Sequence, residues 1–345
     1  MSILITGGTG YIGSHMVVYL LERNFDCVIV DNLINSHKKV IEHIKNILPA
    51  SSSSLHFHEV DICNEDDMET IMQNYDFTAC IHFAGVKAVG ESVDDPMKYY
   101  HNNVVGSYTL LKLLQKYKCK NIIFSSSCTV YGNKDTDNIR ETNSTIPVNP
   151  YGRSKLVVEN MLKDINISEK GEWNIDILRY FNPIGSHQSC LLHENPIGIP
   201  NNLFPYILQV VSGVKDKIRV FGDTYLTKDG TGVRDYIHIM DLVEGHYVCL
   251  QDMLNRDKLN TPKLCRTYNL GTGVGTSVLD VIKHFQTVSG MNIPYSICST
   301  RSGDIAWSVC NPDKIKKELG WTTKHTIQDA IKSVLLSLQY KENFM

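Results

Sequence analysis

Tyr151 and Lys155 stand four positions apart in the segment NPYGRSK, residues 149–155, which has the composition of a helix start. Positions i and i+4 lie on one helix face, so this phenol and this ammonium group can point the same way. A free phenol has a pKa of about 10, and lowering that pKa to about 7 requires about 4 kcal/mol. One cation about 4 Å away supplies a similar amount at an effective dielectric near 20. The pair therefore suits a tyrosine base, although the same spacing also occurs on ordinary solvated helices.

Three glycines follow the first apolar run and open a helical pattern. Gly7, Gly10 and Gly13 form a G-x-x-G-x-x-G arrangement in the segment GGTGYIGSH. Such glycines allow a sharp turn and let a pyrophosphate approach the N–H groups at a helix start. Taken alone they can also mark nothing more than a turn.

An acidic residue makes the nucleotide interpretation stronger. Asp31 ends the second apolar run, about where the ribose of a dinucleotide needs an acceptor for its 2′-hydroxyl. A carboxylate there repels a 2′-phosphate, and the sequence next to it contains no arginine. The expected cofactor is therefore NAD rather than NADP.

Further residues are expected near that cofactor from their places after the apolar runs. Asp61 and Ile62 would meet the adenine, whereas Phe83, Ala84 and Lys87 follow the fourth run towards the cofactor. Plain core packing explains Phe83 and Ala84 equally well. At the end of the fifth run, Ser127 could donate a hydrogen bond to the reacting hydroxyl, so that Tyr151 would act as the base in an alcohol oxidation.

The elements that carry these residues alternate in a regular way. Short apolar runs separated by helical patterns predict parallel strands joined by crossovers. We expect an α/β protein with a Rossmann-type doubly wound sheet over residues 1–185 and a smaller mixed α/β domain over residues 186–345. The boundary is expected to be interlaced, because residues 266–273 read as a strand that returns to the first sheet. The predicted strands lie within residues 3–6, 27–31, 55–61, 79–85, 121–127 and 175–181, and helices within 14–23, 98–116 and 151–163.

Composition excludes several classes of protein. With 34 basic and 37 acidic residues among 345, the chain has no net positive field for nucleic acid or anionic lipid. The ten cysteines show no C-x-x-C pair and no cluster with His at metal spacing, so we expect reduced thiols and no metal. Without a signal-peptide pattern or an apolar run of membrane-spanning length, the expected location is the cytoplasm.

Longer motifs make the chain resemble the extended short-chain dehydrogenases/reductases, and among them the UDP-glucose 4-epimerase family. The resemblance runs from Met1 to about Trp321. It rests on the segments TGGTGYIGSH, DNLINS, IHFAGVKAVGES, YYHNNVVGS, FSSSCTVYG, PYGRSK, LRYFNPIG, GIPNNLFPYI, FGDTYLTKDGTGVRDYIHIMDL and NLGTGVGTSVLDV.

This resemblance implies a reaction without net redox change. Bound NAD⁺ would oxidise C4 of a UDP-sugar while Tyr151 takes the O4 proton. The 4-keto sugar would then turn over and be reduced on its other face, which interconverts UDP-galactose and UDP-glucose. The family also implies a homodimer formed by a bundle of the helices predicted at residues 98–116 and 151–163.

The family pattern assigns further residues. It brings Tyr11, Ile12, Asn32, Asn35, Ser36, Asn102, Tyr180 and Phe181 to the cofactor. It brings Ser127, Thr129, Asn182, Asn202, Leu203, Phe221, Arg234, Arg301 and Asp304 to the UDP-sugar.

Two positions depart from that pattern. Cys128 stands where alanine is usual, and a thiol there could make the site sensitive to oxidation. Ser308 stands where relatives have either a bulky tyrosine or a small residue beside the 2-position of the sugar. Serine leaves room, so we expect UDP-N-acetylglucosamine and UDP-N-acetylgalactosamine to be substrates too, unless the neighbouring Trp307 shifts it.

Other activities remain open at this stage. Related dehydratases carry Asp-Glu directly after the catalytic serine or threonine, whereas this chain reads CTVYG. A UDP-pentose 4-epimerase is compatible with every motif above. A non-catalytic NAD-dependent redox sensor is a different class, and such proteins typically lose the tyrosine or the lysine.

Overall fold

Two units interleave along the chain. The computed structural model describes residues 1–197, 202–300 and 304–344. One unit comprises Met1–Gly132, Thr145–Arg179 and Val243–Tyr268, and the other comprises Asn133–Ser144, Tyr180–Leu242 and Asn269–Met345. The first unit thus takes in a later segment of the chain, and the second takes in an earlier one.

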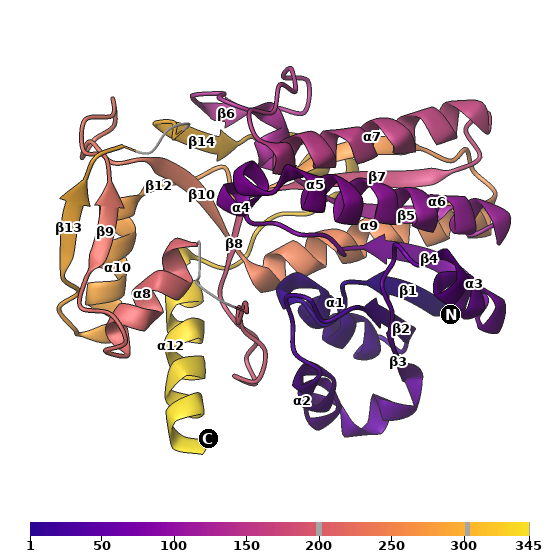
Figure 1. The fold of residues 1–345 in the computed structure, drawn as a ribbon, viewed down its shortest axis with the longest axis horizontal. Helices are drawn as coiled ribbons and strands as arrows, with labels where there is room; N and C mark the ends of the chain where they lie inside the picture. Colours follow the sequence, from indigo (N-terminus) through magenta and orange to yellow (C-terminus); the bar gives the residue numbers. More distant parts are fainter. Residues whose placement is uncertain (198–201, 301–303, 345) are drawn as a thin grey trace. The chain divides into compact units, whose positions relative to one another are not determined.

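The first unit is built on a parallel sheet (Figure 1). Within the described residues its seven strands lie in the order β11-β7-β5-β4-β1-β2-β3. The pairs β3–β2, β2–β1, β1–β4 and β4–β5 are parallel, which confirms the predicted α/β class. The strands are β1 (Ser2–Thr6), β2 (Asp26–Asp31), β3 (Leu55–Glu59), β4 (Phe77–His82), β5 (Asn121–Ser127), β7 (Asn174–Tyr180) and β11 (Cys265–Leu270).

Helices cover both faces of this sheet, because alternate residues of each buried strand are apolar on either side. Leu4, Val28 and Phe124 pack with α3, α6 and α7 in one buried cluster. On α1 and α9, Tyr19 and Tyr247 meet edge to face. The helices are α1 (Tyr11–Leu21), α2 (Lys39–Ile47), α3 (Glu65–Asn74), α4 (Val89–Asp94), α5 (Pro96–Tyr99), α6 (Gly106–Lys116), α7 (Pro150–Ser168) and α9 (Ile239–Leu259), with 3₁₀ turns η1 (Pro49–Ser54) and η3 (Cys128–Tyr131).

The helix predicted at residues 98–116 is present, but it is not α-helical throughout. After α5 the chain forms a π-helical turn, η2 (Tyr100–Val105), and only then enters α6. In a π turn the backbone hydrogen bonds join residues i and i+5 instead of i and i+4, and such a turn often marks a functional region. Every residue of the segment is compatible with an α-helix, so the apolar period alone could not show the turn.

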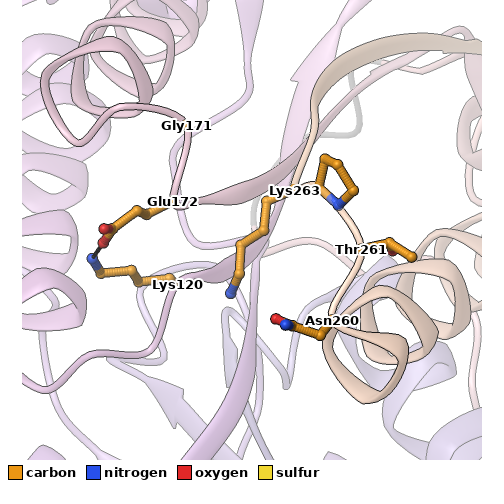
Figure 2. Close-up of a pocket in the computed structure, with 7 residues that line it drawn as sticks. Lys120, Gly171, Glu172, Asn260, Thr261 and Lys263 are labelled. Carbon is orange, nitrogen blue, oxygen red and sulfur yellow. Dashed lines mark hydrogen bonds and ion pairs between the residues drawn. The ribbon is translucent and has the colours of Figure 1, made fainter.

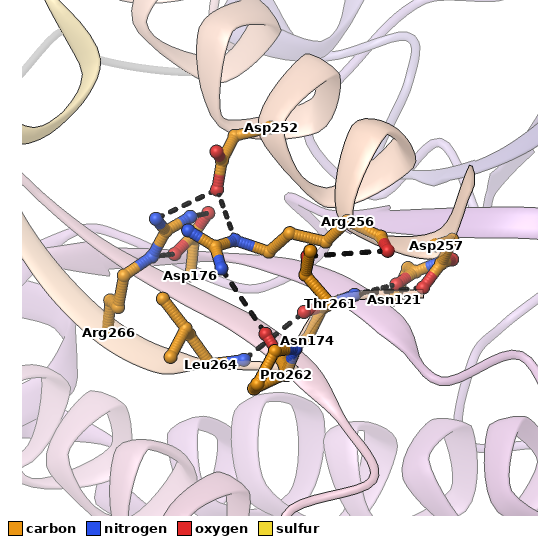
Figure 3. Close-up of polar contacts among 10 residues, drawn as sticks. All are labelled: Asn121, Asn174, Asp176, Asp252, Arg256, Asp257, Thr261, Pro262, Leu264 and Arg266. Carbon is orange, nitrogen blue, oxygen red and sulfur yellow. Dashed lines mark hydrogen bonds and ion pairs between the residues drawn. The ribbon is translucent and has the colours of Figure 1, made fainter. Parts of the chain in front are cut away.

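A polar network fastens β11 and α9 to the sheet edge (Figure 3). Arg266 on β11 forms two parallel hydrogen bonds with the fully buried Asp176 of β7, at 2.8 and 2.9 Å. It also pairs with Asp252 of α9 at 2.9 Å, and Arg256 donates to the same carboxylate at 2.7 Å. The network explains how residues 243–268 come to belong to the first unit.

The second unit contains, in its described part, a five-stranded and a two-stranded sheet. β10 pairs with β8 and β14 in parallel and with β12 in antiparallel fashion. Its strands are β6 (Thr136–Ile139), β8 (Asn182–Ile184), β9 (Ile218–Phe221), β10 (Val233–His238), β12 (Gly275–Ser277), β13 (Tyr295–Cys298) and β14 (Trp307–Cys310). Its helices are α8 (Leu203–Val211), α10 (Val278–Ser289), α11 (Asp313–Leu319) and α12 (Ile327–Phe344).

Apolar residues of α8, α10 and α12 form the core of this second unit. Phe204, Phe285 and Ile331 are buried against Val220 of β9 and Tyr236 of β10. In neither unit do the described residues include a helix with the length and apolar content that a membrane span requires.

Candidate active site

The glycine turn between β1 and α1 brings two loops into close contact. Gly7 has a positive φ of 71°, and a Cβ built on it would lie 2.6 Å from the backbone nitrogen of Ala84. A Cβ on Gly13 would lie 2.2 Å from the carbonyl oxygen of Gly7. Gly10 caps α1 without a side chain, which leaves the helix start open for a phosphate. The turn also sits where the strand order reverses between β1 and β4, the usual ligand position in such sheets.

The Asp31 carboxylate is held in place by neighbouring donors. Its oxygens accept from the backbone nitrogens of Thr9 at 3.1 Å and Leu33 at 2.9 Å, and from the Ser36 hydroxyl at 3.2 Å. Asp31 is 9 % exposed at the end of β2. The carboxylate therefore stands beside the glycine turn in a fixed orientation, which suits the ribose of NAD.

A second carboxylate follows β3. Asn32 donates to Asp61 at 2.9 Å, and the backbone nitrogen of Cys63 donates to it at 2.8 Å. Burial by itself raises the pKa of Asp61, but these hydrogen bonds outweigh it and the net shift is downward. Asp61 is thus kept ionised as an acceptor, while the adjacent Ile62 is buried.

The other residues expected near the cofactor occupy varied positions, and their roles stay predictions. Phe83 packs against His246 of α9, with 5.1 Å between ring centroids. Asn102 lies in the π turn and donates to the Lys98 carbonyl. Of the others, Tyr11, Ile12 and Ala84 are half-buried, Asn35 and Lys87 are exposed, and Tyr180 and Phe181 are buried.

Helix α7 carries the tyrosine and the lysine from its first turns. Asn149 caps it by accepting from the Gly152 nitrogen at 2.8 Å, and Pro150 occupies the first helical position, where no N–H is needed. A Cβ on Gly152 would lie 2.9 Å from the Thr129 carbonyl oxygen. The glycine after Tyr151 therefore allows the start of α7 to approach η3 closely.

Three consecutive serines at the end of β5 each bind one residue of α7. Lys155 Nζ donates to the Ser125 carbonyl at 2.8 Å, and the Ser126 hydroxyl donates to Glu159 at 2.6 Å. The Ser127 hydroxyl forms a hydrogen bond with Tyr151 that favours the phenolate. It also accepts from the Thr129 hydroxyl at 3.0 Å. The predicted triplet of Tyr151, Lys155 and Ser127 is thus brought together on adjacent elements of one unit.

Burial shifts the pKa values of both Tyr151 and Lys155. Burial raises the pKa of Tyr151 to about 12, against the lowering effect of the Ser127 hydrogen bond. Burial also lowers the pKa of Lys155 to about 8. Burial thus disfavours the charged form of both groups, and the Lys155 ammonium is bonded to the Ser125 carbonyl.

Glu159 and Arg179 were missed by the sequence interpretation. They form a buried ion pair on α7 and β7, with Arg179 Nε donating to Glu159 at 2.9 Å and Nη2 at 2.6 Å. Their side chains are 0 and 3 % exposed. Glu159 follows Lys155 by four positions and therefore lies on the helix face of Tyr151. This four-residue spacing is the sequence signal that could have identified Glu159.

In the second unit, two of the residues expected to bind UDP-sugar are neighbours. Arg234 of β10 is the register partner of Ser308 of β14, so their side chains leave the sheet on the same face. Arg234 Nη1 donates to the carbonyls of Val233 and Ile305. Trp307 points to the opposite face, as the next residue of a strand must.

The remaining residues expected at the sugar nucleotide are spread over the second unit, and their roles are also predictions. Asn182 is in β8, Asn202 and Leu203 are at the start of α8, Phe221 ends β9, and Asp304 precedes β14. Asn202 is exposed and donates to Glu194 at 2.8 Å. Arg301 lies outside the described residues.

An open pocket lies at the end of the first sheet opposite the glycine turn (Figure 2). It is lined by residues that precede β5, β7 and β11, and therefore sits at the amino ends of these strands. Lys120 pairs there with Glu172, and Lys263 pairs with Asp257. Ligands of such sheets bind at the carboxyl ends, where the glycine turn and Ser127 are found. This pocket is not the candidate active site.

Comparisons with known proteins agree with this geometry. The family model described as GDP-mannose 4,6 dehydratase matches residues 4–334. A UDP-glucose 4-epimerase of Bacillus subtilis is 46% identical over 329 residues, covering 95% of this chain and 94% of the relative.

Solved structures give the same result. The UDP-glucose 4-epimerase of Bifidobacterium longum, in complex with NAD⁺ and UDP, superposes with a TM-score of 0.92 at 42% identity, over 99% of each chain. That of Stenotrophomonas maltophila, with bound NAD and formylated UDP-arabinopyranose, gives a TM-score of 0.93 at 41% identity over 100% of each chain. On this similarity in sequence and fold, the chain belongs to the UDP-glucose 4-epimerase family.

Proposed function

We propose that this protein interconverts UDP-galactose and UDP-glucose by inverting C4, with NAD as its resident cofactor. The observation that carries the proposal is that Tyr151 and Lys155 lie on successive turns of α7, where Lys155 Nζ donates at 2.8 Å to the Ser125 carbonyl. Ser125 belongs to β5, the strand that ends in Ser127. This arrangement occurs in a chain that is 46% identical to a UDP-glucose 4-epimerase over almost its full length.

The first unit supplies the cofactor site. The open start of α1 would receive the pyrophosphate, and Asp31 would accept from the ribose. When bound, NAD⁺ accepts an electron pair with a hydrogen from the sugar carbon, and the positive charge of its ring favours a neighbouring phenolate. Asp31 excludes a 2′-phosphate by charge, so NADP is a poor substitute.

Tyr151 is the group that exchanges a proton with O4 of the sugar. Because burial raises its pKa to about 12, the isolated site leaves the phenol protonated at neutral pH. The Ser127 hydrogen bond acts in the opposite direction, and the same hydroxyl can orient O4 beside the phenol. Lys155 fixes the end of β5 and holds a cation close to the helix face of Tyr151.

The second unit would hold the UDP. Arg234 can receive phosphate oxygens with its planar fork, and Asn182, Phe221 and Asp304 extend the site by analogy with the family. We also propose turnover of the N-acetylated analogues, because Ser308 is small and shares a sheet face with Arg234.

A homodimer is proposed from the exposed apolar side chains of two neighbouring helices. Tyr108 of α6 is 56 % exposed, and Ile167 of α7 is 74 % exposed. The two helices contact each other, and exposed apolar side chains of this kind are what a second copy would cover. Light scattering is expected to give twice the mass of the chain; a monomer would contradict this proposal.

The central experiment uses the purified protein without added NAD. Incubated with UDP-galactose, it is expected to yield UDP-glucose, and UDP-N-acetylgalactosamine is expected to yield its gluco isomer. Reduction of bound NAD without sugar inversion would instead indicate a redox sensor. Inversion of a UDP-pentose but not of UDP-galactose would indicate a pentose epimerase.

A further inference from the structure

A series of buried polar side chains begins at Thr6, the residue before the glycine turn of the first unit. At the end of β1, Thr6 Oγ1 lies 2.7 Å from His82 Nδ1 at the end of β4. His82 Nε2 lies 2.8 Å from Ser107 Oγ on α6, and that hydroxyl donates to the backbone carbonyl of Asn103 in the π turn. All four residues are at most 2 % exposed.

The same connection continues from Asn103 to the catalytic helix. The Asn103 amide accepts from the Val86 nitrogen at 2.8 Å and donates to the Val86 carbonyl and to Ser154 Oγ, the latter at 2.9 Å. Ser154 then donates to the Tyr151 carbonyl at 2.8 Å. We call this series of hydrogen bonds, from Thr6 through His82, Ser107, Asn103 and Ser154 to Tyr151, the Thr6–Tyr151 path.

The path has a single consistent direction of donation. The only hydrogen of the Ser107 hydroxyl goes to Asn103, so Ser107 must accept from His82 Nε2–H. His82 Nδ1 then carries no proton and accepts from the Thr6 hydroxyl. Burial lowers the pKa of His82 to about 3, and the charge of Lys155 acts in the same direction. The His82 imidazole is therefore neutral, with its proton on Nε2, and the hydroxyls of Thr6 and Ser107 each donate one hydrogen bond.

The π turn takes part in this path through Asn103. The backbone carbonyl of Asn103 accepts from Ser107. The side-chain amide of Asn103 accepts from the Val86 nitrogen and donates to Ser154. π turns are rare and occur mostly as single turns inside α-helices, frequently at functional sites. Asn103 thus links the loop after β4, which carries the predicted cofactor residues, to the first turn of α7.

We propose that the members of the Thr6–Tyr151 path are positioning residues, which set the place of the Tyr151 phenol relative to the glycine turn. The proposal rests on the proposed function for its kinetic test, but not for its structural test. None of the members between the two ends is required to touch a reacting atom. Their effect passes through the π turn and the backbone of α7.

Thr6→Val tests the path with little change of shape, because it replaces only a hydroxyl by a methyl group. We expect kcat with UDP-galactose to fall about 10- to 100-fold while KM and bound NAD stay as in the parent. Thr6→Ser keeps the hydroxyl and is expected to keep kcat. Ser107→Ala should reproduce the loss, and Thr6→Val combined with Ser107→Ala should be no worse than either change alone, because both interrupt one path.

Hydrogen–deuterium exchange provides a readout without turnover. In Thr6→Val, residues 100–107 and 150–155 are expected to exchange faster than in the parent. Met72→Ala, which creates a cavity in α3 within the same core, should destabilise the protein without changing kcat. Parental kcat in Thr6→Val, additive losses in the double variant, or faster exchange confined to β1 would overturn the proposal. If the parent itself fails to convert UDP-galactose, the proposed function fails, while the exchange result still decides on the path.

Discussion

The Lys155 ammonium donates to the main-chain carbonyl of Ser125, 2.8 Å away. This bond ties α7 to β5 directly beside Ser127, so the lysine has a structural contact as well as a charge. Burial lowers the pKa of Lys155 to about 8, which means that the group stays mostly cationic at neutral pH. Changing the lysine should therefore affect both the stability of the site and the chemistry of Tyr151.

Lys155→Met is expected to reduce kcat at least about 100-fold, because the cation near Tyr151 is lost. It should also lower the free energy of unfolding by about 1–3 kcal/mol, because the buried Ser125 carbonyl loses its donor. Tyr151→Phe is the matched comparison: it keeps the Lys155 contact, so it should lose activity without that loss of stability. Equal stability of the two variants would contradict the structural part of this prediction.

Asp31→Ala is expected to weaken NAD binding about 10- to 100-fold, because hydrogen bonds to a charged acceptor contribute about 1.5–3 kcal/mol. The donors of Thr9, Leu33 and Ser36 also lose their acceptor, so the glycine turn should loosen. Calorimetric titration of the NAD-free protein measures the affinity. Asp31→Asn keeps acceptor atoms and should lie between the two. An unchanged affinity for NAD would refute the assignment.

Ser308→Tyr is expected to abolish turnover of UDP-N-acetylgalactosamine and to spare UDP-galactose. A large ring on the sheet face of Arg234 fills the space that the N-acetyl group needs. Product analysis with both sugars measures the effect, and Ser308→Ala serves as the control that should retain both activities. Absence of N-acetylhexosamine turnover in the parent would show that the pocket has another shape.

Arg266→Ala is expected to destabilise the first unit by about 3–5 kcal/mol, because it leaves the buried Asp176 carboxylate without its partner. Arg256→Ala removes a half-buried pair with Asp252 and should cost no more than about 1 kcal/mol. Urea unfolding measures both. Similar values for the two variants would mean that the buried pair does not stabilise the sheet edge.

His82 should make stability depend on pH. Its folded pKa of about 3 is below the unfolded value of about 6.5, so the unfolded chain binds a proton that the folded chain does not. The stability contributed by the neutral ring is complete above pH of about 6.5 and is lost as the pH falls towards about 3. The expected slope is about 1.4 kcal/mol per pH unit for this group.

His82→Phe cannot bind that proton in either state. Its free energy of unfolding, measured by urea at pH values between about 6 and about 5, should fall less steeply than that of the parent. The variant will be less stable near neutrality, but the comparison concerns the slopes. Parallel slopes would mean that His82 is charged in the folded protein.

The sheet of the first unit was predictable, because its strands are short apolar runs and the segments between them have the apolar periodicity of helices. Its edge was predictable only in part. Residues 266–273 read as a returning strand, and β11 occupies Cys265–Leu270 beside β7. The partnership of Arg266 with Asp176 leaves no periodic signal, since it joins charges 90 positions apart. Long-range pairs of this kind decide which segments belong to which unit.

The part of the candidate site that depends on the four-residue spacing of Tyr151 and Lys155 was predictable, because this spacing places both side chains on one helix face. Tyr151, Lys155 and Ser127 do lie on adjoining elements, as the spacing indicates. The acceptor of Lys155 is a main-chain carbonyl, and main-chain groups are the same in every residue. The direction of the Tyr151 pKa shift depends on burial, which only the folded structure determines.

A growing chain would complete the two units out of order. The ribosome releases Asp176 early, but Arg266 and α9 emerge only after residues 180–242, which belong to the other unit. Until then β7 has an unpaired edge and a carboxylate without its cation. A nascent chain that stalls near residue 185 would expose that edge to other chains, and aggregation is then the expected fate.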